Sequence, residues 1–127
     1  MILVDTSIWI DHLHRPEPRL VALLERDEVG THPLVIEELA LGSIGRRREV
    51  LDLIGSLRCF PALRHEELLA LVEGRALWGR GLSVADANML GSVALVPGAR
   101  LWTRDRRLAV ACRELDLELV DEPPPST

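Results

Sequence analysis

Acidic residues stand at four points of the sequence where they could share one site. Two of them come directly after short apolar runs, and two lie in segments with helical spacing. The acids are Asp5, Asp86, Asp105 and one of the neighbours Glu37 and Glu38. No His or Cys ligand pattern accompanies them, and carboxylate oxygens without such partners suit Mg²⁺ or Mn²⁺ better than zinc. The residue types therefore point to a carboxylate-held divalent cation.

Each acid also has a purely structural interpretation. Asp5 and Asp105 could cap helices, because a side-chain oxygen at that position accepts an otherwise unpaired backbone N–H. The segment Ser83–Asp86 has the layout of a capping box, with Asp in place of the usual Glu or Gln. Glu38 could be an ordinary exposed helix residue, and helical periodicity does not choose between it and Glu37. Only convergence of the acids would favour the functional interpretation.

Convergence would itself demand a cation. Two like charges ~5 Å apart at an effective dielectric constant of about 20 repel by roughly 3 kcal/mol. A cluster of four carboxylates would therefore be unfavourable until a metal ion neutralised it.

The elements that must position these acids alternate along the chain. Short apolar strands are predicted at residues 1–4, 29–31, 99–103 and 117–120. Helices are predicted at residues 8–13, 20–27, 33–41, 46–57, 65–78, 83–96 and 105–115, with residues 59–63 as an extended link. This alternation predicts an α/β layer fold with a mostly parallel central sheet flanked by helices. In such sheets ligands bind beyond the carboxyl ends of the strands, where Asp5 and Asp105 are expected.

Length and composition fit one compact domain. The chain has 127 residues, 47% of them hydrophobic, so we expect one domain over residues 1–121 and a disordered tail over residues 122–127. Cys59 and Cys112 lack the spacing of a zinc site or a disulfide framework. Neither a secretory leader nor a membrane-length apolar span is evident, so we expect a cytoplasmic protein with no membrane association.

The net charge of −5 argues weakly against a nucleic-acid partner. Its distribution leaves that partner open, because the basic residues are all arginine and cluster at Arg46–Arg48 and around Asp105. The second cluster, Arg104, Arg106 and Arg107, could contact an RNA backbone or face solvent. No aromatic residues interleave the first cluster, which favours a solvated surface there.

Four segments together resemble the PIN-domain nucleases, and the small VapC-type toxins of bacterial toxin–antitoxin pairs in particular. They are Val4–Ile10, Ile36–Gly42, Leu82–Ala87 and Leu101–Asp105. Each motif alone is weak, but their order, intervals and total length fit the family from Met1 to about Val120. The resemblance implies a three-layer PIN-like fold and a Mg²⁺- or Mn²⁺-dependent endoribonuclease that cleaves RNA with metal-activated water.

The resemblance also assigns the site residue by residue. It selects Glu38 over Glu37 and makes Asp5, Glu38, Asp86 and Asp105 the catalytic, metal-holding acids. Thr6 and Thr103 match supporting hydroxyl residues that orient ligands or bound water. The partners that it implies are a cognate antitoxin, an RNA substrate and a second copy in a homodimer.

Two other functions remain open. A phosphoacceptor receiver domain also has a small α/β fold with an acidic Mg²⁺ pocket, but the chain has no lysine, which that family places near the phosphoaspartate. A catalytically silent RNA-binding protein on the same fold is disfavoured by the presence of all four acids.

The remaining polar and aromatic residues receive structural interpretations. Trp9, Trp78 and Trp102 are expected in the core or at an interface, since each has apolar neighbours. None of the histidines is assigned a ligand role. Asn88 is expected to face solvent, with contact to metal-bound water as the alternative.

Overall fold

The computed structural model describes residues 1–122 and contains, within them, five strands and seven helices. The strands are β1 (Ile2–Val4), β2 (Val29–Thr31), β3 (Arg58–Cys59), β4 (Arg100–Trp102) and β5 (Glu118–Leu119). The helices are α1 (Thr6–His14), α2 (Pro18–Glu25), α3 (Pro33–Leu41), α4 (Arg47–Ser56), α5 (His65–Arg75), α6 (Val84–Leu95) and α7 (Arg106–Glu114). Within this part of the chain, no helix has the length and apolar character needed to span a bilayer.

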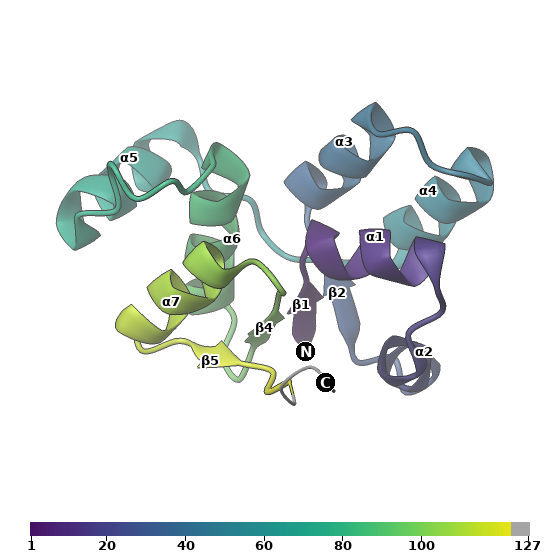
Figure 1. The fold of residues 1–127 in the computed structure, drawn as a ribbon. Coiled ribbons are helices and arrows are strands. Elements are labelled where there is room, and N and C mark those ends of the chain that lie inside the picture. The colour runs from purple at the N-terminus through teal and green to yellow at the C-terminus, as the bar shows by residue number, and fades with distance from the viewer. Residues whose placement is uncertain (123–127) are drawn as a thin grey trace.

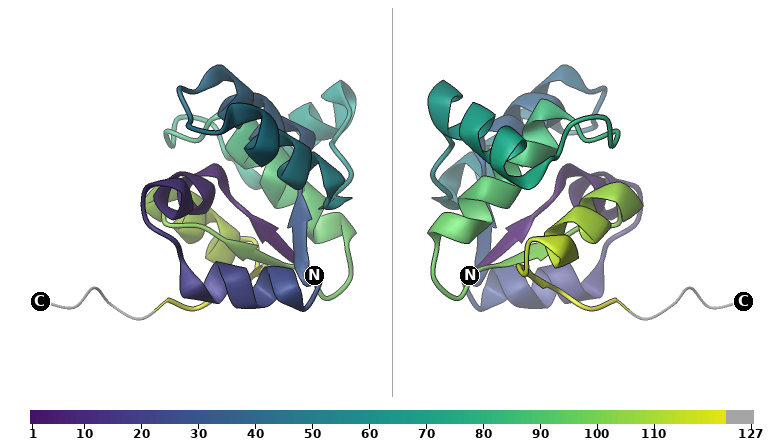
Figure 2. Two further views of the ribbon diagram at one scale, coloured as in Figure 1. Left: turned by 90° about the vertical axis from the view of Figure 1, so that its right-hand side faces the viewer. Right: turned by 90° about the vertical axis from the view of Figure 1, so that its left-hand side faces the viewer.

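All the strands of this sheet run parallel, in the order β3-β2-β1-β4-β5. Helices α1 to α4 lie on one side of β1 and helices α5 to α7 on the other (Figure 1). The two side views place α3 and α5 toward the opposite end of the molecule from α2 (Figure 2). The prediction of an α/β fold with a parallel sheet between helices is confirmed.

The strand order reverses direction between β1 and β4. The chain leaves β1 toward β2 but leaves β4 toward β5, on the other side of the sheet. Open parallel sheets bind ligands in the crevice at such a switch point. The carboxyl ends of β1 and β4 are therefore the expected place for a functional site.

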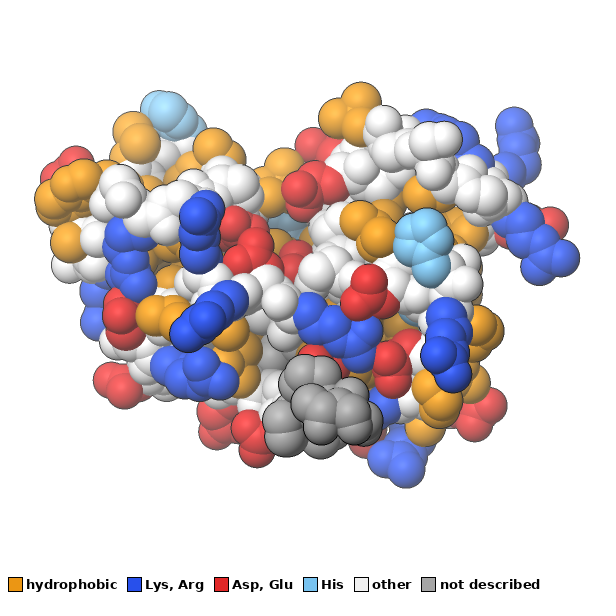
Figure 3. All heavy atoms as spheres, in the orientation of Figure 1, with side chains coloured by type: hydrophobic (Ala, Val, Ile, Leu, Met, Phe, Trp, Pro, Cys, Tyr) orange, Lys and Arg blue, Asp and Glu red, His pale blue; other side chains and the backbone are white. Residues whose placement is uncertain are grey.

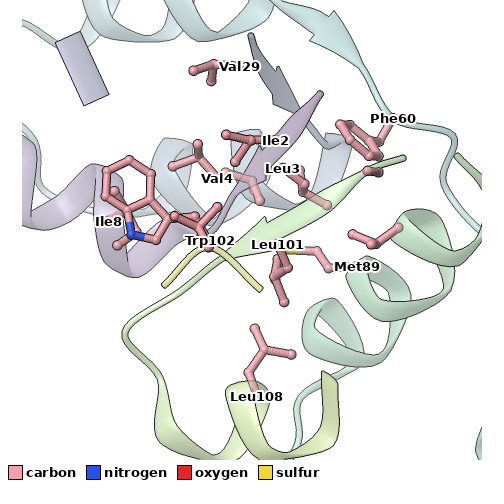
Figure 4. Packing of buried hydrophobic residues seen from close by; sticks show 14 of the residues in the cluster. Ile2, Leu3, Val4, Ile8, Val29, Phe60, Met89, Leu101, Trp102 and Leu108 are labelled. Carbon is pink, nitrogen blue, oxygen red and sulfur yellow. The ribbon is translucent and has the colours of Figure 1, made fainter. Parts of the chain in front are cut away.

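The hydrophobic core packs around the strands that form this crevice. Residues Ile2, Leu3 and Val4 of β1 are at most 2% exposed and pack with Leu101 and Trp102 of the neighbouring strand. Figure 4 shows these side chains together with residues from the surrounding helices, among them Ile8, Met89 and Leu108. Burial on both faces explains why β1 is apolar throughout rather than alternating.

The strand β3 was not predicted from the sequence, which indicated an extended link at residues 59–63. Its residues pair with Gly30 and Thr31 at the sheet edge and are exposed, so they carry no apolar pattern. The Phe60 ring that follows packs onto Gly30, where an added Cβ would lie 2.4 Å from a ring carbon. A glycine in β2 is thus required for this close approach.

Candidate active site at the carboxyl ends of β1 and β4

Asp5 occupies the centre of the switch point. It follows β1 directly, is 5% exposed and caps α1 by accepting the Thr6 N–H at 2.7 Å. Its other carboxylate oxygen accepts hydrogen bonds from the hydroxyls of Ser7 at 2.9 Å and Thr103 at 2.6 Å. Asp5 therefore caps a helix, as the structural interpretation of the sequence expects, and also places a buried carboxylate in the site, as the functional interpretation expects.

The segment after β4 joins this site through Thr103. Its hydroxyl donates to Asp5 and accepts the backbone N–H of Asp105 at 3.0 Å. The Asp105 side chain in turn accepts the N–H groups of Arg107 at 2.9 Å and Leu108 at 3.3 Å, which caps α7. Thr103 thus links the two acids that follow the neighbouring strands β1 and β4.

Glu38 reaches the same site from α3. One of its carboxylate oxygens accepts the hydroxyl of Thr6 at 3.0 Å. The pKa of Glu38 is raised, first by partial burial and then by the charges of Asp5 and Asp86, while the Thr6 hydrogen bond opposes the shift. The Glu38 carboxylate therefore lies close enough to Asp5 and Asp86 for their charges to raise its pKa.

Asp86 enters from the first turn of α6. Its side chain accepts the Ser83 N–H at 2.9 Å and its own N–H donates to the Ser83 hydroxyl at 3.0 Å, so the predicted capping box forms. Burial raises its pKa most, and the charges of Asp5 and Asp105 raise it further against the Ser83 hydrogen bonds. Acids from separate segments are thus held in one electrostatic cluster, and acidic side chains are visible in the hollow between α3 and α6 (Figure 3).

Comparison with known proteins agrees with this geometry. A family model described as the PIN domain matches residues 2–114, which is most of the chain. The chain belongs to the PIN-domain family. The sequence is also 63% identical over 122 residues to Ribonuclease VapC32 of Mycobacterium tuberculosis, in strains CDC 1551 and H37Rv, covering 96% of this chain and 98% of the relative. The predicted family and activity, a PIN-domain ribonuclease of the VapC type, are confirmed.

Solved structures share the fold at low sequence identity. FitAcB from Neisseria gonorrhoeae aligns with a TM-score of 0.58 and 22% identity, over 95% of this chain and 97% of that one. PAE2754 from Pyrobaculum aerophilum aligns with a TM-score of 0.54 and 20% identity, over 91% and 95% respectively. FitAB bound to an IR36 DNA fragment gives a TM-score of 0.57 at 22% identity over 94% of both chains. These alignments support the PIN-domain architecture.

The donor chemistry of this PIN-domain site fits a hard cation. Carboxylates and hydroxyls surround the switch point, and these are the oxygen ligands that Mg²⁺ and Mn²⁺ prefer. Within residues 1–122, however, no three acidic, His or Cys side chains converge closely enough to form a preassembled metal site. Each carboxylate instead accepts hydrogen bonds from a hydroxyl or a backbone N–H. The residue types fit the cation chemically.

A buried polar network positions the two helices that carry Glu38 and Asp86. His32, fully buried at the N-cap of α3, accepts the Leu34 N–H at Nδ1. Its Nε2 therefore carries the proton, and lies 3.0 Å from both Asn88 Oδ1 and Ser92 Oγ of α6. Burial lowers the pKa of His32, which keeps the ring neutral.

The expected solvent-facing position of Asn88 is wrong. The residue is 5% exposed, and its Oδ1 also accepts the Leu63 N–H at 2.9 Å, so its polar oxygen is used inside the protein. No local pattern around Asn88 indicates this role, because its partners lie 25 and 56 residues away in the sequence. A His at a helix start, before proline, was the one available hint.

Arg104 is neutralised within the protein. Its guanidinium contacts the carboxylates of Asp11 at 2.8 Å, Glu17 at 2.6 Å and Glu122 at 2.9 Å. These bonds make it a poor candidate for a phosphate contact, unlike its neighbours Arg106 and Arg107, which are exposed. Glu122, the first residue of the predicted tail, also accepts the Trp102 indole N–H at 2.7 Å. The rest of that tail lies outside the described residues.

Proposed function

We propose that this VapC-type ribonuclease is a Mg²⁺- or Mn²⁺-dependent endonuclease and the toxin of a toxin–antitoxin pair. The observation that carries the proposal is the joining of Asp5 and Asp105 through Thr103 at the sheet's switch point, within the electrostatic reach of Asp86 and Glu38. These four acids would hold the cation. A bound divalent ion supplies Lewis acidity toward the phosphodiester and lowers the pKa of water toward neutrality.

The protein's own residues prepare the site for that chemistry. The hydroxyls of Thr103 and Ser7 fix the buried carboxylate of Asp5, and the hydroxyl of Thr6 fixes Glu38. These contacts hold the carboxylates of Asp5 and Glu38 in defined orientations within the site. Preorganised charge of this kind is effective because little reorganisation is needed during reaction.

Substrate binding is assigned to the basic end of α7. Arg106 and Arg107 follow Asp105 directly and are exposed, so a phosphate backbone that contacts them would pass the acidic site. The net charge of −5 does not prevent this, because phosphate contacts depend on local arginine clusters. We place the protein in the cytoplasm, where RNA is available and where its two free cysteines stay reduced.

A surface beside Glu38 is suited to binding the antitoxin partner. A cavity of about 210 Å³ lies between α1 and the segment after α3, lined by Ile10, Leu13, Leu39 and Ile44 together with Glu38 itself. Ile10 is 42% exposed and Leu13 is 36% exposed, so apolar surface is available at this cavity. An antitoxin segment bound there would cover one of the metal-holding acids. Homodimer formation is proposed from the family resemblance.

The test compares a site variant with a matched surface variant. Asp5→Asn keeps the size of the side chain and one acceptor oxygen, but it replaces the other oxygen by an N–H donor and removes the buried charge. Cleavage of RNA in Mg²⁺ or Mn²⁺ should therefore fall by at least about 100-fold. Asp52→Asn, on the exposed face of α4, should retain full activity. Cleavage is followed on total RNA, with EDTA as the metal-free reference and end-sequencing of products. Full activity of Asp5→Asn, or cleavage unaffected by EDTA, would overturn the proposal.

A further inference from the structure

Trp78 is exposed, so of the two positions expected for the tryptophans it does not occupy the core. It is 60% exposed in the loop between α5 and α6, whereas Trp9 and Trp102 are 1% exposed. Leaving a tryptophan in water forfeits the large burial energy of its ring, so an exposed one beside other apolar groups marks a binding surface. Val84, at 66% exposure, extends the apolar surface around it.

The loop that carries Trp78 is bounded by the acidic site. It begins where Ala76 ends α5 in a left-handed conformation, and it ends at Ser83, whose backbone N–H and hydroxyl hold Asp86. Trp78 is therefore connected to a metal-holding acid by a short segment of fixed geometry. Ser83, which holds Asp86, also lines the cleft beside Trp78.

A shallow cleft runs under this loop. Its walls are Leu68 and Val72 of α5, Leu77 and Trp78 of the loop, and Val84 and Ala87 of α6. The cleft measures about 150 Å³, well below the roughly 300–1,000 Å³ of pockets that enclose small-molecule ligands. A flat group stacked against the exposed ring fits this surface better than a ligand held inside it.

Guanidinium groups border the same loop. The Arg107 side chain lies against Gly81, where an added Cβ would be 2.6 Å from its Nη1 and where φ is +75°. With Arg80, Arg106 and Val110, Arg107 lines an adjoining hollow of about 280 Å³. Arg80 pairs with Glu114 at 2.6 Å, but within residues 1–122 no carboxylate lies in ion-pair range of Arg106 or Arg107. Blue side chains gather over α7 beside the acidic hollow (Figure 3).

We propose that Trp78 stacks on an unpaired base of the RNA substrate while Arg106 and Arg107 contact its phosphates. Single-stranded nucleic acids are bound by this combination of an aromatic face and adjacent arginines. The inference rests on the proposed ribonuclease function and adds the residue that selects an unpaired nucleotide next to the cleaved bond. A second copy of the chain is the competing occupant, but a cationic border next to a carboxylate cluster suits a polyanion better than an identical surface.

Binding is measured without cleavage. The probe is a single-stranded oligoribonucleotide of adenosines, added to Asp5→Asn protein while tryptophan fluorescence is recorded. Because Trp9 and Trp102 are buried, stacking should quench chiefly Trp78. Trp78→Ala in the same background should bind about 5- to 150-fold more weakly by an anisotropy assay, the range for losing one stacked base. Trp78→Phe, which keeps a ring, should lie near the parent.

Cleavage kinetics with intact acids separate this inference from the proposed function. Trp78→Ala should raise KM with little change in kcat, because the stacked base is not the reacting group. If Asp5→Asn loses activity but Trp78→Ala keeps the parental KM and affinity, the stacking role is wrong and the ribonuclease proposal stands. If Asp5→Asn keeps activity, the proposed metal-dependent mechanism itself fails. A lower molar mass of Trp78→Ala in light scattering would identify the patch as a subunit interface and overturn the inference.

Discussion

Replacing Asn88 by alanine should weaken the hydrogen-bond network that links the start of α3 to α6. The Asn88 Oδ1 atom accepts hydrogen bonds from Leu63 N at 2.9 Å and His32 Nε2 at 3.0 Å. Without it, the Leu63 N–H has no acceptor, whereas the His32 ring still has Ser92 Oγ at 3.0 Å. The substitution therefore leaves the Leu63 N–H without an acceptor and the His32 Nε2–H with one acceptor fewer.

The expected magnitude follows from that count. One unsatisfied buried donor costs about 1–3 kcal/mol, and the truncated side chain adds roughly 1 kcal/mol for lost packing. We expect the free energy of unfolding to fall by about 2–4 kcal/mol. With an unfolding entropy near 2.1 cal/mol/K per residue and 127 residues, this corresponds to a Tm lower by about 7–15 °C.

The assay is urea unfolding followed by circular dichroism, with RNA cleavage measured at a temperature where both proteins are folded. Cleavage should fall by about 10- to 100-fold, since the network positions the helices that carry Glu38 and Asp86. Leu95→Ala is the control, because Leu95 lies on the same helix but is 54% exposed and should change stability by no more than about 0.5 kcal/mol. A loss for Asn88→Ala no larger than that of the control would refute the reasoning.

Two further predictions concern charge. Asp86→Asn keeps an acceptor for the Ser83 N–H but removes a carboxylate whose pKa is raised. Because an acid with a raised pKa destabilises the fold as pH rises through its titration, the free energy of unfolding of the metal-free variant at neutral pH should be higher by about 0.5–2 kcal/mol. Urea unfolding measures this difference, and a lower free energy of unfolding would contradict the assigned repulsion. His32 has a lowered pKa, so the unfolded chain binds more protons below pH ~6.5, and the stability of the parent should fall from pH 7.5 to 5.5. His32→Gln should flatten that slope, and an unchanged slope would exclude His32 as its cause.

The sequence alone determined where along the chain the acids of the site lie relative to the strands and helices. Apolar runs ending at Asp5 and just before Asp105 predicted acids at the carboxyl ends of strands, and the structure places those strands side by side. The capping box at Ser83 and Asp86 was also readable, because capping depends on residues only three positions apart. The choice of Glu38 over Glu37 came from the family resemblance, and the contact of Glu38 with Thr6 agrees with it.

Tertiary structure alone decided which polar and aromatic side chains are covered. Trp78 and Trp102 both have apolar neighbours in sequence, yet one is 60% exposed and the other 1%, because only Trp102 lies on a central strand. Arg104 and Arg107 are the same residue type, but the carboxylates that neutralise Arg104 come from α1, the turn before α2 and Glu122 after β5. Local sequence specifies caps and periodicity, whereas burial and charge pairing depend on which distant segments pack together.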